Sequence, residues 1–247
     1  MKKIAIMTAG GDCAGLNAAI KSVVMAASKN NIVVVGIIDG FIGFVERKYM
    51  VLDNKIVENI ERQGGTILGS SNKECPFHYP SKEKKDEYED RVDDSIKALR
   101  KIGVEAMIII GGDGTLDSAR VIDEAGMPTI GIPKTIDNDM VASNPTIGFD
   151  TGVENAVEAI RKLKTTAASH RRVMVVEMMG RTSGYLTLYS GFAAGADIIL
   201  LPERDYDLNI VCNRVKEIMS TDKRYVIIAV SEACKEKGKK ETISKVI

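Results

Sequence analysis

Short apolar runs that end in segments rich in glycine or acidic residues constrain the fold of this chain more than any other feature. A strand followed by a glycine turn and a helix is how an open α/β sheet presents backbone N–H groups to phosphate, because the unpaired amides at a helix N-terminus carry partial positive charge. Three such segments, with several aspartates among them, predict a phosphoryl-transfer site. The segments are TAGGDCAGLNAAI (8–20), GGDGT (111–115) and PKTIDND (133–139), which follow the apolar runs 4–7, 107–110 and 129–132.

Apolar strand-like runs alternate with helical patterns over the rest of the chain. Short apolar strands separated by amphipathic helices indicate parallel sheets covered on both faces. We therefore expect an α/β protein of two doubly wound lobes, residues 1–148 and 149–247, with mostly parallel sheets and a cleft between the lobes that holds the ligands. The expected strands are 4–7, 32–38, 107–110, 129–132, 173–176, 198–201 and 226–230, and the expected helices are 17–29, 90–102, 116–125, 153–164 and 208–219.

Charge and cysteine content exclude several classes of protein. Lysine plus arginine and aspartate plus glutamate number 34 each, so the net charge is zero. Nucleic acid and anionic membranes attract strongly basic proteins, and neither is an expected partner. The four cysteines are widely spaced, and no run approaches the ~20 apolar residues of a membrane span. With no N-terminal signal pattern, these features predict a cytoplasmic protein.

The GGDGT segment suggests a phosphate and metal site. Its glycines permit close approach of a phosphate to the backbone, and Asp113 is a hard carboxylate suited to Mg²⁺. The alternative is an ordinary turn between a strand and a helix. The segment is not a Walker motif, because no Gly-Lys-Ser/Thr follows it.

The PKTIDND segment suggests a catalytic carboxylate. Asp137 and Asp139 are two residues apart and would point to the same side of an extended segment. One could then influence a metal while the other takes a proton from a hydroxyl. Lys134 adds a cation to the same segment. The alternative is a structural turn, since Asn and Asp are common in turns.

In the second lobe, Arg172 and Arg181 lie before and after an expected strand, where a guanidinium can clamp phosphate. Surface solvation is the alternative for such arginines. Met179 is expected to pack or to line a sugar pocket, and Glu232 ends a strand and is suited to bind sugar hydroxyls.

Seven ordered motifs together resemble those of the 6-phosphofructokinases. The resemblance implies two α/β lobes and a glycolytic kinase. Such an enzyme transfers a phosphoryl group from ATP, with Mg²⁺, to the 1-hydroxyl of fructose 6-phosphate, giving fructose 1,6-bisphosphate. The motifs are GGD-x-x-G-x-N (10–17), RQGGT-x-LGSS (62–71), GGDGT (111–115), PKTIDND (133–139), TIGFDT (146–151), SHRR-x-x-VVE-x-MGR (169–181) and VSE (230–232).

The resemblance assigns the donor to the first lobe. Gly11 looks like the backbone contact to the donor phosphates, and Asp113 looks like the Mg²⁺ ligand. The remaining expected nucleotide contacts are Asn72, Lys73, Gly112, Gly114 and Thr115.

The same resemblance assigns catalysis and sugar binding. Asp137 looks like the base that accepts the hydroxyl proton, and Arg181 would stabilise the transferring phosphoryl group. Arg172 resembles an arginine that reaches the 6-phosphate in a neighbouring subunit, which implies a homo-oligomer. Further substrate contacts or supporting groups are Thr135, Asp139, Met179, Gly180 and Glu232.

The chain departs from the family pattern at its C-terminal side. It lacks the family's His-Ile-Gln-Arg-Gly-Gly segment, so the second lobe is expected to be incomplete and the chain to be either a fragment or a natural truncation. A non-catalytic chain that keeps only phosphate binding is therefore an alternative. So is a pyrophosphate-dependent enzyme, although Gly114 favours ATP because pyrophosphate users carry aspartate there. Lys21, Met25 and Asn54 replace arginines of the family's usual effector site.

Overall fold

The predicted apolar runs form two separate sheets in the computed structural model, which describes residues 1–72, 75–81, 87–141, 145–239 and 242. Each expected strand and helix is present, with ends that shift by a few residues, so the α/β prediction is confirmed. Contacts within the chain divide it into two compact units, Met1–Thr135 and Ile136–Ile247. The division into a nucleotide-binding lobe, 1–148, and a sugar-phosphate-binding lobe, 149–247, remains a prediction.

The sheet of the first unit has the strand order β3-β2-β1-β6-β7. All neighbouring strands are parallel except β2 and β3, which pair antiparallel. The carboxyl ends of β1, β6 and β7 therefore meet at one edge, and this edge carries the three predicted phosphate segments. The strands are β1 (Lys3–Thr8), β2 (Val33–Ile37), β3 (Tyr49–Leu52), β6 (Ala106–Gly111) and β7 (Thr129–Pro133).

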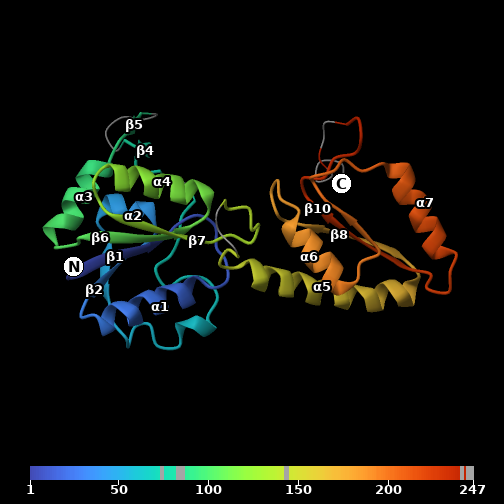
Figure 1. Cartoon of the computed structure of the whole chain (residues 1–247), viewed down its shortest axis with the longest axis horizontal. Helices are drawn as coiled ribbons and strands as arrows, with labels where there is room; N and C mark the ends of the chain where they lie inside the picture. The colour runs from blue at the N-terminus through green and yellow to red at the C-terminus, as the bar shows by residue number, and fades with distance from the viewer. Residues whose placement is uncertain (73–74, 82–86, 142–144, 240–241, 243–247) are drawn as a thin grey trace. The chain divides into compact units, whose positions relative to one another are not determined.

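Helices cover both faces of this sheet (Figure 1). Successive residues of β1 alternate between two cores: Ala5 and Met7 pack with α2, α3 and α4, whereas Ile4 and Ile6 pack with α1 and η1. Burial of both strand faces explains why the strands read as continuous apolar runs. The helices are α1 (Leu16–Lys29), α2 (Phe41–Glu46), η1 (Ile60–Arg62), α3 (Val92–Lys101) and α4 (Asp113–Glu124). A short antiparallel pair, β4 (Tyr79–Pro80) and β5 (Tyr88–Glu89), lies outside this sheet.

The second unit has a parallel sheet of order β8-β10-β9. Helices α5 and α6 pack on one face and α7 on the other. Periodicity did not predict α6, because its apolar residues lie on its exposed and its buried side and no polar face stands opposite them. The elements are α5 (Phe149–His170), β8 (Val173–Met178), α6 (Tyr185–Ala194), β9 (Ile198–Leu200), α7 (Leu208–Met219) and β10 (Val226–Ser231). Among the described residues no helix is both long and apolar enough to cross a membrane.

Candidate functional site

The turn after β1 is held by hydrogen bonds to the segment that contains Ser70 and Ser71. The Gly10 N–H donates to the Ser71 carbonyl over 2.9 Å, and Ser70 Oγ donates to the Gly10 carbonyl over 2.6 Å. Gly10 has φ +83°, a left-handed conformation that glycine adopts without steric cost. The turn is therefore fixed in place before any ligand binds.

A polar cavity of about 670 Å³ opens beside this turn. Glycines and short polar residues make up most of its lining, and Asp12 and Asp39 add two carboxylates to it. Gly11 and Asn72, both predicted donor contacts, line it, whereas Lys73 lies outside the described residues. The full lining is Gly10, Gly11, Asp12, Asp39, Ile42, Gly65, Thr66, Ser70, Ser71 and Asn72.

The GGDGT segment enters α4 directly. Gly112 is the N-cap in extended conformation, and Asp113 is the first helical residue, so the helix begins three residues earlier than predicted. Asp113 and Gly114 are exposed, whereas Thr115 is buried. A Cβ atom on Gly10 would lie 3.2 Å from Thr115 Oγ1, so the two glycine turns approach closely and Thr115 packs between them.

Lys134 joins the third predicted segment to the other two. Its N–H donates to the Gly111 carbonyl over 2.9 Å, and its buried Nζ donates to the Gly11 carbonyl over 2.6 Å. The ammonium group thus ties the turn after β1 to the end of β7. The prediction that the three segments lie together is confirmed up to Thr135, the half-buried last residue of the first unit.

Asp113 fits a magnesium ion that is shared with a ligand. Among the described residues no group of three or more His, Cys, Asp or Glu side chains could hold a metal alone. Magnesium is commonly bound by one or two carboxylates together with substrate phosphates, and an exposed carboxylate beside a glycine turn provides such a ligand. The donor set therefore suits Mg²⁺ that arrives with a nucleotide.

Asp137 and Asp139, both in the second unit, do not lie in an extended segment. Asn138 between them has φ +51°, so the segment is not extended and the alternation of a strand does not apply. Asp137 is buried, at 8% exposed, and Asp139 is exposed. The expectation of an extended segment is wrong, because Asn138 is left-handed and its Oδ1 accepts the Thr146 N–H over 3.1 Å.

The turn after β8 brings Gly180 and Arg181 to Glu232 at the end of β10. Glu232 Oε1 accepts the Gly180 N–H over 3.1 Å and the Arg181 N–H over 2.8 Å. Arg181 has φ +52°, which is uncommon for a residue with a side chain. The carboxylate predicted to bind sugar hydroxyls therefore also anchors the turn that carries Arg181.

Arg172 and Met179 lie at different ends of β8. Arg172 precedes the strand, whereas Arg181 follows it, so the two guanidinium groups start from opposite edges of the sheet. Both arginines flank the strand as predicted. Met179 is 62% exposed, so it does not pack in the core of this unit.

Burial decides the state of the nearby cysteine Cys234. Desolvation raises the pKa of this thiol to about 11, so it stays protonated near neutral pH. Only the thiolate is a good nucleophile, and Cys234 is therefore a packing residue.

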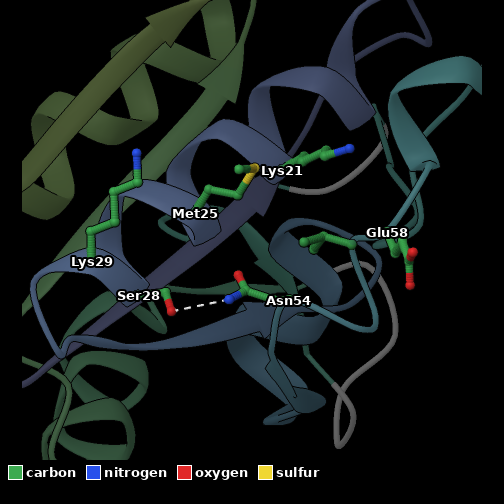
Figure 2. Close-up of a pocket in the computed structure, with 7 residues that line it drawn as sticks. Lys21, Met25, Ser28, Lys29, Asn54 and Glu58 are labelled. Atoms are coloured by element: carbon green, nitrogen blue, oxygen red, sulfur yellow. Dashed lines mark hydrogen bonds between the residues drawn. The ribbon is translucent and has the colours of Figure 1, made fainter.

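A second cavity, of about 390 Å³, occupies the surface between α1 and the segment after β3 (Figure 2). It contains the residues that replace the family's effector arginines. Lys21 is paired with Glu61 over 2.6 Å, and Asn54 Nδ2 donates to Ser28 Oγ over 3.2 Å. Lys29 also lines the cavity, but with Lys21 paired to Glu61 and Met25 in the wall, the cavity offers less positive charge to an anion than an arginine-lined site.

Two residues near the predicted site were missed by sequence reasoning. Asn138 shapes the turn described above. Asparagine adopts the left-handed conformation more readily than most residues, so its presence between two aspartates could have indicated a turn here. Ser183 donates from Oγ to the Asp137 carbonyl over 3.0 Å. No sequence signal marks it, because the two residues are 46 positions apart.

Comparisons with known proteins agree with these motifs. An ATP-dependent 6-phosphofructokinase 2 from Clostridium perfringens is 45% identical over 250 residues, covering 100% of this chain and 68% of that protein. A protein of the same name from Streptomyces coelicolor is 45% identical over 231 residues, covering 93% and 65%. The chain thus spans about two thirds of the length of these relatives.

Solved structures share the fold. Phosphofructokinase from Saccharomyces cerevisiae matches with a TM-score of 0.83 and 29% identity, covering 96% of this chain and 34% of that one. A pyrophosphate-dependent phosphofructokinase from Marinobacter aquaeolei matches with a TM-score of 0.79 and 21% identity, covering 96% and 62%. Because the family model for phosphofructokinase matches residues 3–247 and curated relatives are 45% identical, this chain belongs to the phosphofructokinase family.

Proposed function

We propose that this chain carries the catalytic machinery of an ATP-dependent 6-phosphofructokinase. It would transfer the γ-phosphoryl group of ATP to the 1-hydroxyl of fructose 6-phosphate in glycolysis. The observation that carries the proposal is the convergence of three phosphate-type segments, tied by Lys134, beside a polar cavity of about 670 Å³. Relatives at 45% identity are named ATP-dependent 6-phosphofructokinase, which supports the choice of reaction.

In the proposed reaction Asp137 is the general base. Its carboxylate takes the proton of the 1-hydroxyl while that oxygen forms a bond to the γ-phosphorus. The bond from the γ-phosphorus to the bridging oxygen breaks, and ADP leaves with the electron pair. The Arg181 guanidinium stabilises the charge on the transferring group, because positioning and charge neutralisation supply most of the catalysis in phosphoryl transfer.

Asp113 is the residue proposed to hold Mg²⁺. The bound ion would neutralise charge on the donor phosphates. The backbone amides of Gly11, Gly112 and Gly114 are proposed to contact the same phosphates, with Asn72 and Thr115 as supporting groups in the wall.

ATP is the proposed donor, and pyrophosphate is the alternative. A Cβ atom on Gly114 would meet no protein atom within 4 Å, so this position leaves room for a nucleotide phosphate. Lys134 is frequent in pyrophosphate users but also occurs together with Gly114 in ATP users, so the lysine alone does not decide the donor.

Sugar binding is assigned to the second unit and to a neighbouring chain. Glu232, Met179 and Gly180 are proposed to contact fructose 6-phosphate, and Thr135 and Asp139 to support it. Arg172 lies at the opposite edge of the sheet from Arg181, which is consistent with service to a partner's site in a homo-oligomer. Four free cysteines suit the reducing, cytoplasmic setting that we propose.

Steady-state assays of the purified chain test this function directly. The chain is incubated with fructose 6-phosphate and Mg²⁺, together with either ATP or pyrophosphate, and fructose 1,6-bisphosphate is measured. Formation of the bisphosphate with ATP supports the proposal, and faster formation with pyrophosphate contradicts the donor. A chain that binds ATP in calorimetry without turnover would be the non-catalytic form.

A further inference from the structure

Hydrogen bonds in the second unit connect the Asp137 segment to the turn after β8. Ser183 Oγ donates to the Asp137 carbonyl over 3.0 Å, and both residues are buried at 8% exposed. The Ser183 N–H donates to the Gly180 carbonyl over 2.8 Å. The N–H groups of Gly180 and Arg181 donate in turn to Glu232. Ser183 is thus the link between the proposed base and the proposed phosphoryl-stabilising arginine.

The turn at the centre of this network is tightly constrained. Gly180 has φ +145°, and a Cβ atom there would lie 2.5 Å from the Ser183 carbonyl oxygen. Arg181 is also left-handed, at φ +52°. Such conformations persist only when the surrounding contacts determine them. The turn therefore fixes the position of Ser183, and the Ser183 hydroxyl in turn holds the Asp137 carbonyl.

Hydrogen bonds to other parts of the second unit hold the backbone around Asp137. The following residue, Asn138, is left-handed, so no strand ladder fixes the segment. The Ser183 hydroxyl ties it to the turn after β8, and the bond from the Thr146 N–H to Asn138 Oδ1 ties it to the segment before α5. Loss of the hydroxyl would remove one tether and leave a buried carbonyl with one partner fewer.

We propose that Ser183 is a positioning residue, whose hydroxyl holds the Asp137 segment in register with the turn that carries Arg181. The inference rests on the proposed function, in which Asp137 is the base. Misplacement of a catalytic group by about 1 Å can cost on the order of 10²-fold in rate. Ser183 itself touches no reacting atom in this scheme, so its loss should lower turnover and leave substrate affinity nearly unchanged.

Three variants test the role by kinetics. Ser183→Ala should lower kcat by roughly 10- to 100-fold, with KM for both substrates within about twofold. Ser183→Thr, which keeps the hydroxyl, should recover most of the turnover. Thr187→Val is the matched control, because this α6 hydroxyl is fully buried and has no hydrogen-bond partner among the described residues. Equal losses in Ser183→Ala and Thr187→Val, or a change in KM alone, would overturn the inference.

Hydrogen–deuterium exchange separates this inference from the proposed function. In Ser183→Ala, peptides covering residues 136–141 and 179–184 should exchange faster than in the wild type and in Thr187→Val. An inactive wild type would refute the proposed function, while the exchange measurement would still decide the positioning role. Unchanged exchange over 136–141 would show that the hydroxyl does not hold this segment.

Discussion

At the scale of single residues, burial separates two aspartates that look equivalent in the sequence. Asp137 is buried and Asp139 is exposed, with a left-handed asparagine between them. A buried carboxylate held by its backbone is a better candidate for proton transfer than one on the surface, because general bases must be placed within hydrogen-bond reach of the proton. The two positions should therefore respond differently to the same substitution.

Replacement of Asp137 by asparagine should abolish most of the turnover. Loss of a general base lowers the rate by roughly 10²- to 10⁴-fold, and Asp137→Asn keeps the size of the side chain. Steady-state kcat is the measurement, and ATP affinity should remain nearly unchanged. Asp139→Asn is the matched control and should retain more activity. If Asp137→Asn turned over at nearly the wild-type rate, the base would have to be another group.

Introduction of aspartate at Gly114 should block ATP without harming the fold. The new side chain would enter open space, and a carboxylate in the first turn of α4 interacts favourably with the helix dipole. Its charge would oppose the donor phosphates, and like charges brought together cost several kcal/mol, or about 10²-fold or more in rate. The measurement is kcat/KM for ATP beside the melting temperature. Unchanged ATP use in a folded Gly114→Asp variant would place the nucleotide elsewhere.

At the scale of elements, the start of α7 depends on a side-chain cap. Asp207 Oδ1 accepts the Asn209 N–H over 2.9 Å, and this helix covers one face of the second sheet through Ile218 and its neighbours. Removal of an N-cap costs about 1 kcal/mol, so the free energy of unfolding should fall by that amount in Asp207→Ala. Urea denaturation measures it. Asp222→Ala, at an exposed site outside the helix, should leave the free energy of unfolding nearly unchanged. If Asp207→Ala also left it unchanged, the cap would not stabilise the helix.

At the scale of the whole molecule, we predict that the chain self-associates through exposed apolar residues of α6. Tyr185, Leu188, Tyr189 and Phe192 follow helical spacing on one face, and Phe192 is 81% exposed. Contiguous apolar patches on soluble proteins mark interaction sites, and the proposed homo-oligomer would cover this one.

Light scattering after size exclusion should find wild-type particles larger than one chain. Phe192→Glu should shift them toward the monomer, because a charge would then face the apolar partner surface. Ile210→Glu, at another exposed apolar position, on α7 and 68% exposed, should leave the assembly intact. If the wild-type chain were monomeric at all concentrations, the proposed homo-oligomer would be contradicted.

The sequence predicted the parallel strands, the five longer amphipathic helices and the three phosphate-type segments, because a chain buried on both faces of a parallel sheet must carry short apolar runs that end in turns. It did not predict the short antiparallel strands β3, β4 and β5. It did not determine that β3 runs antiparallel, that α6 is a helix, or that Lys134 is held by Gly11. Nor did it predict that Asp137 is buried while Asp139 is exposed, or that Ser183 holds the backbone of Asp137. These features depend on hydrogen bonds and packing between residues far apart in the chain, or on one left-handed dihedral angle. The local sequence pattern contains no information about long-range contacts or about a single dihedral angle, so these features become visible in the folded structure alone.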